Sequence, residues 1–156
     1  MFSQSAEYAL RAVVWLASHR EMPLTNQQVA RATQVPPSYL AKVLQALSRA
    51  GLVHAQRGPH GGFTLSRPPA ELTLLDVVNA VDPVRRIQVC PLARRKHRKE
   101  LCSLHACMDE AISLAEAHLA RATVDTLIEG GGRQPLDAVH VDGDSAPRQV
   151  AIRGEG

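Results

Sequence analysis

The sequence predicts a mainly α-helical chain: a winged helix-turn-helix with a small β-hairpin wing, followed by a long C-terminal dimerisation helix. The first observation is composition, because the 156 residues are 45% hydrophobic but only 3% aromatic, which favours helices over a sheet-dominated fold. The second is a pair of short helical patterns separated by a proline-containing break. The third is a glycine-rich turn between two short strand-like segments directly afterwards.

The first expected helix covers residues 3–19 and is apolar on two sides. Leu10 and Val13 lie on one side, and Tyr8 and Trp15 lie on the other. A helix with two apolar sides is expected to be buried on both, for example between its own domain and a second chain.

The next two helices form the expected helix-turn-helix. Thr25 and Gln28 have the spacing of a capping box, so a short helix begins there. The break QVPP at residues 34–37 ends it, and a second helix is expected over residues 38–50, before Gly51. The outward side of this second helix carries no acidic residue and consists of Ser38, Tyr39, Ala41, Lys42, Gln45 and Arg49.

A hairpin is expected immediately after the second helix. Residues 52–56 and 63–65 are predicted strands, and the segment RGPHGG between them has the glycine and proline content of a tight turn. Arg57 and His60 would lie at its tip. A hairpin in this position is the wing of a winged helix-turn-helix.

The charge distribution indicates a polyanionic partner. Residues 1–70 contain seven Arg and Lys against two Glu, and residues 84–100 contain seven against Glu100 alone, within a net charge of +3. Charge alone would equally fit a solvated face, but its place on a helix-turn-helix favours double-stranded DNA. The expected DNA contacts are Thr25, Gln28, Ser38, Tyr39, Lys42, Gln45, Arg57, His60 and Gly61.

Two more helices are expected in the second half of the chain. Thr73 and Asp76 would cap a short helix that Asp82-Pro83 ends. Residues 101–129 then have the 4-3 spacing of a heptad repeat, and one helix over this range would be roughly 40 Å long. Such a helix has little of its own chain to contact, so we expect it to pair with its twin; an internal core helix is the alternative.

The expected organisation therefore has four parts. Residues 1–83 form the DNA-binding domain, residues 84–103 a cysteine-containing sensor loop, and residues 104–129 the dimerisation helix. Residues 130–156 are rich in Gly, Asp and Pro without periodicity, and are expected to be a disordered tail.

All three cysteines lie in one stretch, CPLARRKHRKELCSLHAC, at residues 90–107. An odd number of cysteines, without a signal peptide or an apolar run of membrane length, indicates thiols in the reducing cytoplasm. Thiolates bind soft metal ions and react with oxidants. Four interpretations are open: buried apolar cysteines, a zinc site formed by Cys90, Cys102, His105 and Cys107, a metal-free thiol switch, or an iron–sulfur cluster.

Three stretches carry a resemblance to a known family: AEYALRAVVWLA at 6–17, VPPSYLAKVLQALSRAGLV at 35–53 and RGPHGGFTLSRPPAELTLLDVVNAV at 57–81. Over roughly residues 1–128 the chain resembles the IscR/NsrR family of bacterial winged-helix regulators. The resemblance implies a dimeric transcription factor in which three cysteines, here Cys90, Cys102 and Cys107, hold an iron–sulfur cluster (2Fe-2S or 4Fe-4S). It also implies a fourth ligand from the first helix of the other subunit, where Glu7 stands at the matching position.

The cysteine spacing departs from this family's pattern. The gaps here are eleven and four residues, which leaves the cluster type open and makes His105 the alternative fourth ligand. We expect a cytoplasmic homodimer that binds a palindromic operator, acts as a repressor, and responds to redox state, nitric oxide or iron supply. The alternative is a zinc-binding or cluster-free thiol-redox regulator. An enzyme is disfavoured because no Ser/His/Asp constellation, phosphate loop or CxxC motif is present.

Overall fold

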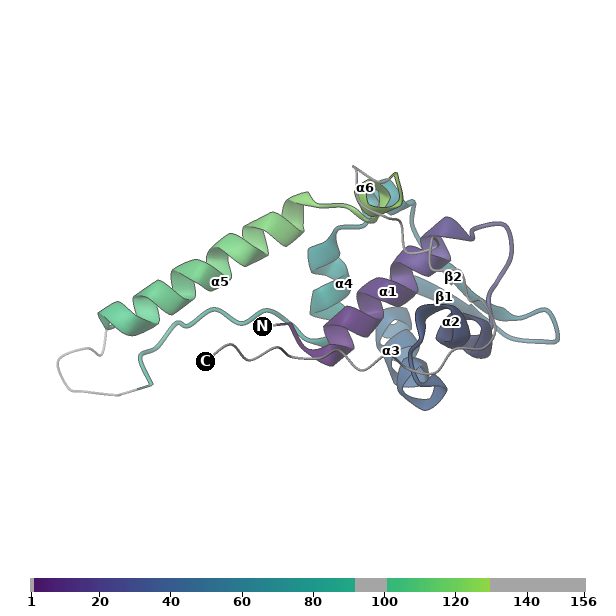
Figure 1. The fold of residues 1–156 in the computed structure, drawn as a ribbon, viewed down its shortest axis with the longest axis horizontal. Coiled ribbons are helices and arrows are strands. Elements are labelled where there is room, and N and C mark those ends of the chain that lie inside the picture. The colour runs from purple at the N-terminus through teal and green to yellow at the C-terminus, as the bar shows by residue number, and fades with distance from the viewer. Residues whose placement is uncertain (1, 92–100, 130–156) are drawn as a thin grey trace, which may run out of the picture.

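A computed structural model describes residues 2–91 and 101–129, and in these ranges the chain is mainly helical with one two-stranded antiparallel sheet (Figure 1). The predicted fold class is confirmed. The predicted tail at residues 130–156 lies outside the described residues. The elements are α1 (Gln4–Ser18), α2 (Asn26–Thr33), α3 (Pro37–Arg49), β1 (Val53–Gln56), β2 (Gly62–Leu65), a short 3-10 helix η1 (Pro69–Glu71), α4 (Leu74–Val81), α5 (Ser103–Arg121) and α6 (Val124–Ile128).

Helix α1 is the centre of the core. It packs against α2 and α3, and also against α4 and α6, so both of its apolar sides are covered by this chain's own helices. Its buried residues are mostly small: Ala6, Ala9, Ala12, Val13, Val14, Leu16 and Ala17. Small side chains let neighbouring helices approach closely, which explains how one short helix contacts four others.

The helix-turn-helix has the predicted caps. The Thr25 hydroxyl accepts from the Gln28 amide and the Gln28 side chain accepts from the Thr25 amide, which completes the capping box of α2. Gln34 ends α2 in the left-handed conformation, with φ of 56°. Helix α3 then begins at Pro37, one residue earlier than predicted, because proline is well suited to the first turn of a helix. Its inward face is buried, and each leucine there contributes about 1.5–3 kcal/mol; this face consists of Leu40, Val43, Leu44 and Leu47.

The wing is attached to the core through backbone hydrogen bonds. Strands β1 and β2 pair in antiparallel register, with Val53 opposite Leu65 and Gln56 opposite Gly62. Leu24 adds a bridge on the other side of β2, because its amide donates to the Phe63 carbonyl and the Phe63 amide donates back. A Cβ on Gly62 would lie 2.6 Å from the Leu24 carbonyl oxygen, so only glycine fits where the two backbone segments meet.

The prediction of one continuous helix over residues 101–129 is wrong. Helix α5 ends at Arg121, and Ala122 and Thr123 are extended before α6 begins. Thr123 forms a bridge with Thr73, with hydrogen bonds of 2.9 Å from Leu74 N to the Ala122 carbonyl and from Val124 N to the Leu72 carbonyl. These contacts and the full burial of Val124 override the heptad pattern, since they bring α6 back onto α1.

Helix α5 extends away from the core. Residues 82–91 run from the core toward the outer end of α5 as an irregular segment beside it (Figure 1). Leu119, near the core, is the one buried residue of α5. Leu104, Met108 and Leu114 are large apolar side chains that this helix exposes. In the described ranges, no helix has both the length and the apolar character needed to cross a membrane.

Candidate DNA interface and thiol–histidine site

The outward face of α3 and the wing form one continuous surface. Lys42, Gln45 and Arg49 of α3 line a groove whose other side is formed by Ala55 and Phe63 of the hairpin. The predicted contact residues of α3 are all exposed: Ser38, Tyr39, Lys42 and Gln45. At the wing, Arg57 and His60 are exposed as well. Their contacts with DNA stay a prediction.

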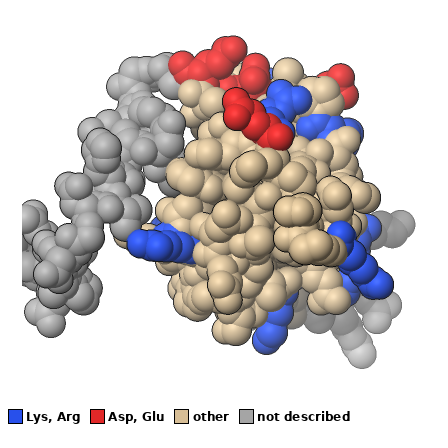
Figure 2. Space-filling view, turned by 90° about the vertical axis from the view of Figure 1, so that its right-hand side faces the viewer, with Lys and Arg blue, Asp and Glu red and all other residues tan. Residues whose placement is uncertain are grey.

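The segment of the chain that forms this surface contains no acidic residue. Residues 22–70, which run from before α2 to after β2, contain no Asp or Glu, but contain Arg31, Lys42, Arg49, Arg57 and Arg67. Figure 2 views the end of the molecule that carries the wing: Lys and Arg lie at its sides and lower edge, and the acidic side chains in view lie near its upper edge, where further Lys and Arg lie beside them. A polyanion would therefore meet cations without opposing carboxylates over this region.

Several of these side chains also have a structural role. Gln28 Oε1 accepts from both the amide and the hydroxyl of Thr25, at 2.8 and 2.9 Å. The Asn26 side-chain amide donates to the Pro37 carbonyl at 2.9 Å and joins the start of α2 to the start of α3. Tyr39 shares a hydrogen bond with Ser5. Asn26 and Ser5 belong to no local motif that predicts these contacts, because their partners are 11 and 34 residues away.

Two of the three cysteines and one histidine converge at the outer end of α5. Cys102 is the N-cap residue of α5 and His105 lies in its first turn. The Nδ1 atom of His105 lies 3.1 Å from the Cys102 sulfur and 3.5 Å from the Cys90 sulfur. The three donor atoms all lie within 4.8 Å of one another. Cys90 is buried and the other two residues are partly exposed.

The other expected ligands lie elsewhere. Cys107 is exposed on α5 and is not a member of this group. Glu7 is on the surface of α1, where its carboxylate forms an ion pair with Arg11 one turn later. Ligation by Glu7 from a second subunit stays a prediction. The basic residues Arg94–Lys99 of the predicted sensor loop lie outside the described residues.

The donor set fits a thiolate- and imidazole-binding metal group. Sulfur and nitrogen ligands of one tetrahedral zinc ion lie about 3.5–3.8 Å apart, given metal–ligand bonds of about 2.0–2.3 Å. The distance from the Cys90 sulfur to His105 Nδ1 has this value at 3.5 Å, while the Cys102 sulfur, at 3.1 Å, lies at hydrogen-bonding distance. Histidine also replaces cysteine as a ligand in some iron–sulfur clusters. Three donors leave at least one ligand to be supplied from elsewhere.

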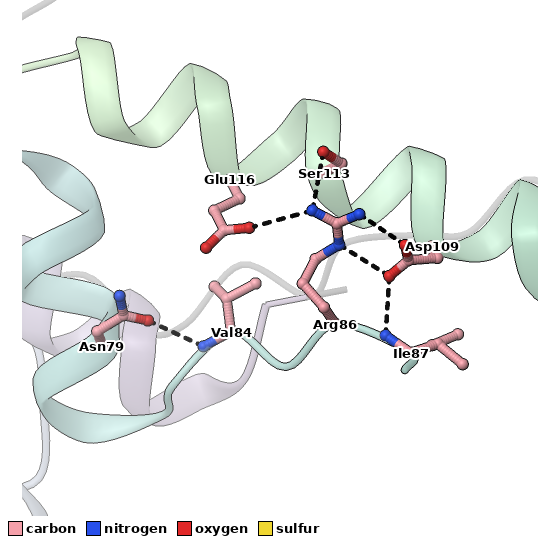
Figure 3. Close-up of polar contacts among 7 residues, drawn as sticks. All are labelled: Asn79, Val84, Arg86, Ile87, Asp109, Ser113 and Glu116. Atoms are coloured by element: carbon pink, nitrogen blue, oxygen red, sulfur yellow. Dashed lines mark hydrogen bonds and ion pairs between the residues drawn. The ribbon is translucent and has the colours of Figure 1, made fainter. Parts of the chain in front are cut away.

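A salt bridge next to this group joins residues 84–91 to α5 (Figure 3). Arg86 contacts Asp109 with two nitrogen–oxygen pairs of 2.8 and 2.6 Å, and the Ile87 amide donates to the same carboxylate at 2.8 Å. These donors, the guanidinium first, lower the pKa of Asp109 to about 2. No local sequence signal predicts this pair, since the two residues are 23 positions apart.

Comparisons with known proteins agree with this architecture. Residues 2–130 match the family model Rrf2, described as an iron-dependent transcriptional regulator. The chain is 32% identical over 135 residues to protein aau3 of Rhizobium meliloti (strain 1021), covering 81% of this chain and 84% of that protein.

Solved structures share the fold. T. potens IscR superposes with a TM-score of 0.68 at 20% identity, covering 94% of this chain and 93% of that one. CymR, the global cysteine regulator of B. subtilis, superposes with a TM-score of 0.67 at 22% identity, covering 81% and 95%. The predicted resemblance is confirmed, and so is the expectation of a regulator and not an enzyme. Because the family model spans the helix-turn-helix, the wing and both C-terminal helices, the chain belongs to the Rrf2 family of transcriptional regulators.

Proposed function

We propose that the protein is a cytoplasmic, homodimeric repressor whose DNA binding responds to an iron–sulfur cluster. The observation that carries the proposal is the convergence of Cys90, Cys102 and His105 at the outer end of α5. This site lies away from the DNA-reading surface, at the end of the helix that leaves the core (Figure 1). A sensor site and a reading surface are thereby connected through α5.

The reading surface supports major-groove recognition. Lys42 and Gln45 lie on the exposed face of α3, where a glutamine amide pairs with adenine and a lysine reaches guanine or phosphate. The wing residues Arg57 and His60 would contact the backbone or the adjacent minor groove. Two copies related by a two-fold axis would read a palindromic operator.

The exposed face of α5 supports a dimer. This helix contacts the core mainly through its C-terminal end, and it exposes the apolar side chains of Leu104, Met108 and Leu114 to water. Pairing of α5 with a second copy would bury this area, and the interface would involve the part of the chain next to the thiol–histidine group. Residues 1–83 would then be the reading domain, residues 84–103 the sensor segment and residues 104–129 the dimer segment, although this last segment is divided between α5 and α6.

The ligands follow from the donors that are present. Cys90, Cys102 and His105 would hold the group, and the remaining ligand would be Cys107 or Glu7 of the partner subunit. When bound, an iron–sulfur cluster supplies a centre that oxygen, peroxide and nitric oxide modify. The chain itself contributes the attachment: Cys90 comes from the segment after α4, and Cys102 and His105 come from α5. Holding all three together fixes this segment to the helix.

A single zinc ion is the second candidate, and a specific observation favours it. The Cys90 sulfur lies 3.5 Å from His105 Nδ1, which is the separation expected of a thiolate and an imidazole that share one tetrahedral ion. Zinc would join the same two segments without redox chemistry, so DNA binding would respond to metal supply but not to air or nitric oxide.

Anaerobic purification of the full chain tests both candidates. Iron and acid-labile sulfide in equal amounts, with visible absorbance, would support the cluster, while a colourless protein with bound zinc would support the ion. Cys102→Ser should lose the bound group and the response of DNA binding to air. Ser103→Ala, an exposed neighbour in the first turn of α5, is the matched control. The proposal would be contradicted if the native protein took up neither iron with sulfide nor zinc.

A further inference from the structure

We propose that the Arg86–Asp109 pair is a latch that sets the register of residues 84–91 along α5, and so positions Cys90 against Cys102 and His105. The inference rests on the proposed function, since it gives these residues a role in forming that ligand set. It assigns Arg86 and Asp109 as positioning residues. Neither is a ligand.

The latch and the thiol–histidine group share one face of α5. His105, Asp109 and Ser113 are spaced four residues apart, so they follow one another along the helix. Arg86 lies over this row, and its guanidinium contacts Asp109, donates to Ser113 Oγ at 3.0 Å and lies 3.8 Å from a Glu116 oxygen (Figure 3). One side chain therefore spans about two helical turns of α5.

The contact is specific in geometry as well as charge. Nε and Nη2 of Arg86 each face one oxygen of Asp109, which is the two-pronged arrangement that guanidinium and carboxylate favour. The Ile87 amide donates to Asp109 Oδ1 as well, so the carboxylate fixes the backbone next to Arg86. In the described part of the chain, these contacts and the Ser113 hydrogen bond are the hydrogen bonds that join residues 85–89 to α5.

The register set by this pair is the one that brings the sulfur atoms together. Cys90 lies four residues after Arg86, a span of at most about 13 Å. Cys102 lies seven residues before Asp109, about 10 Å along the helix. The two spans are similar, so Cys90 arrives at the N-terminal end of α5. A slip of one residue would move the segment by about 3.3 Å, which is nearly the whole 3.5 Å between the Cys90 sulfur and His105 Nδ1.

A metal-free measurement tests the latch by itself. In a full-length Cys107→Ser background, the bifunctional thiol reagent dibromobimane would bridge Cys90 and Cys102, because each sulfur displaces one bromide. We expect Asp109→Asn and Arg86→Ala to slow this bridging about tenfold, the factor to which loss of a charge-assisted hydrogen bond corresponds. Glu110→Gln and Arg85→Ala, which remove the same charges from adjacent exposed positions, should bridge at the native rate. Native rates in both latch variants would overturn the inference.

Arg86→Lys guards against misfolding of the alanine variant. It keeps the positive charge but loses the planar two-pronged contact, and circular dichroism would show whether the helices are retained. Slow bridging in a folded Arg86→Lys protein supports the latch, and native bridging in that protein refutes it.

Zinc uptake by protein that keeps Cys107 distinguishes failure of this inference from failure of the proposed function. If both are right, the native protein binds zinc, or iron with sulfide, and the latch variants bind roughly 10- to 100-fold more weakly. If the native protein binds neither, the proposed function fails while the bridging result still decides the latch. Equal affinity in native and latch variants would overturn the latch alone.

Discussion

The hydroxyl groups of Ser5 and Tyr39 share a hydrogen bond of 2.7 Å, which joins the first turn of α1 to the exposed face of α3. The Tyr39 ring also meets the Tyr8 ring edge-on, with centroids 5.4 Å apart. Tyr39 is thus held by two residues of the central helix, next to Lys42 on the surface assigned to DNA. Its orientation depends on α1 as well as on α3.

Loss of this hydrogen bond should affect DNA binding more than stability. We expect Ser5→Ala and Tyr39→Phe each to lower the free energy of unfolding by at most about 1 kcal/mol, because the hydrogen bond is exposed. If Tyr39 contacts DNA through its hydroxyl, Tyr39→Phe should weaken operator binding more than Ser5→Ala does. Urea unfolding and fluorescence anisotropy measure the two effects. Equal loss of affinity would mean that the hydroxyl acts only through Ser5.

Lys42→Ala should reduce the salt dependence of DNA binding. One phosphate contact fewer per protomer lowers the slope of log affinity against log salt by about 0.9 for each protomer, or about 1.8 for the proposed dimer. Arg121→Ala, which removes an exposed charge at the end of α5, is the matched control and should leave the slope unchanged. Titrations of a duplex operator at several salt concentrations give both slopes. An unchanged slope in Lys42→Ala would remove this residue from the interface.

Gln45→Ala should act on sequence preference instead. A bidentate glutamine–adenine contact discriminates by about 1–3 kcal/mol at one base pair. The variant should therefore bind the operator more weakly than the native protein does. Its affinity for duplexes altered at that base pair should equal its affinity for the operator. A panel of single-base variants tests this, and an unchanged preference at every position would contradict it.

Acid should weaken the attachment of residues 84–91 to α5. The pKa of Asp109 is lowered to about 2, mainly by hydrogen bonds from Arg86 and then from the Ile87 amide. A lowered pKa stabilises the folded state above the ordinary aspartate pKa of 3.8, and this contribution disappears as the pH falls from about 4 to 2. The urea midpoint of the native protein should therefore fall more steeply over this range than that of Asp109→Asn. Parallel curves would show that the pair adds no pH-dependent stability.

Gly62→Ala should disturb the wing. Its Cβ would lie 2.6 Å from the Leu24 carbonyl oxygen and 2.9 Å from the Leu24 amide nitrogen, both backbone atoms. We expect a loss of about 1–3 kcal/mol and weaker DNA binding, because β2 must move away from Leu24. Gly51→Ala is the comparison, since it has φ of 72° but open space around the added carbon. It should cost about 1–2 kcal/mol from backbone strain and leave the wing in place.

Local signals were sufficient for most of the DNA-reading half. The Thr25–Gln28 and Thr73–Asp76 caps, the proline break and the glycine-rich turn each act within a few residues, and the structure has all of them. The end of α5 at Arg121 was not predicted, because a contact distant in sequence determines it. The heptad spacing continues through Ala122, but the pairing of Thr123 with Thr73 is a contact between residues far apart in sequence.

The thiol site was predictable only in part. Clustering identified Cys90 and Cys102 as neighbours, and His105 was recognised as an alternative ligand. Which donors meet is decided by residues that carry no motif, since Arg86 and Asp109 fix the segment that ends in Cys90. Cys107 is separated from His105 by two positions, which in a helix places the two side chains on different faces.

The Thr73–Thr123 bridge has a consequence for how such chains can vary. It closes a loop in the chain: α4 packs on α1 before the loop, α6 packs on α1 after it, and residues 82–121 lie between them. Lengthening the stretch between the first two cysteines adds little closure entropy, about 0.6 kcal/mol for each doubling, and leaves the sequence of the helix-turn-helix and the wing unchanged. The proposed sensor segment could therefore differ in length while the helix-turn-helix and the wing keep their shape.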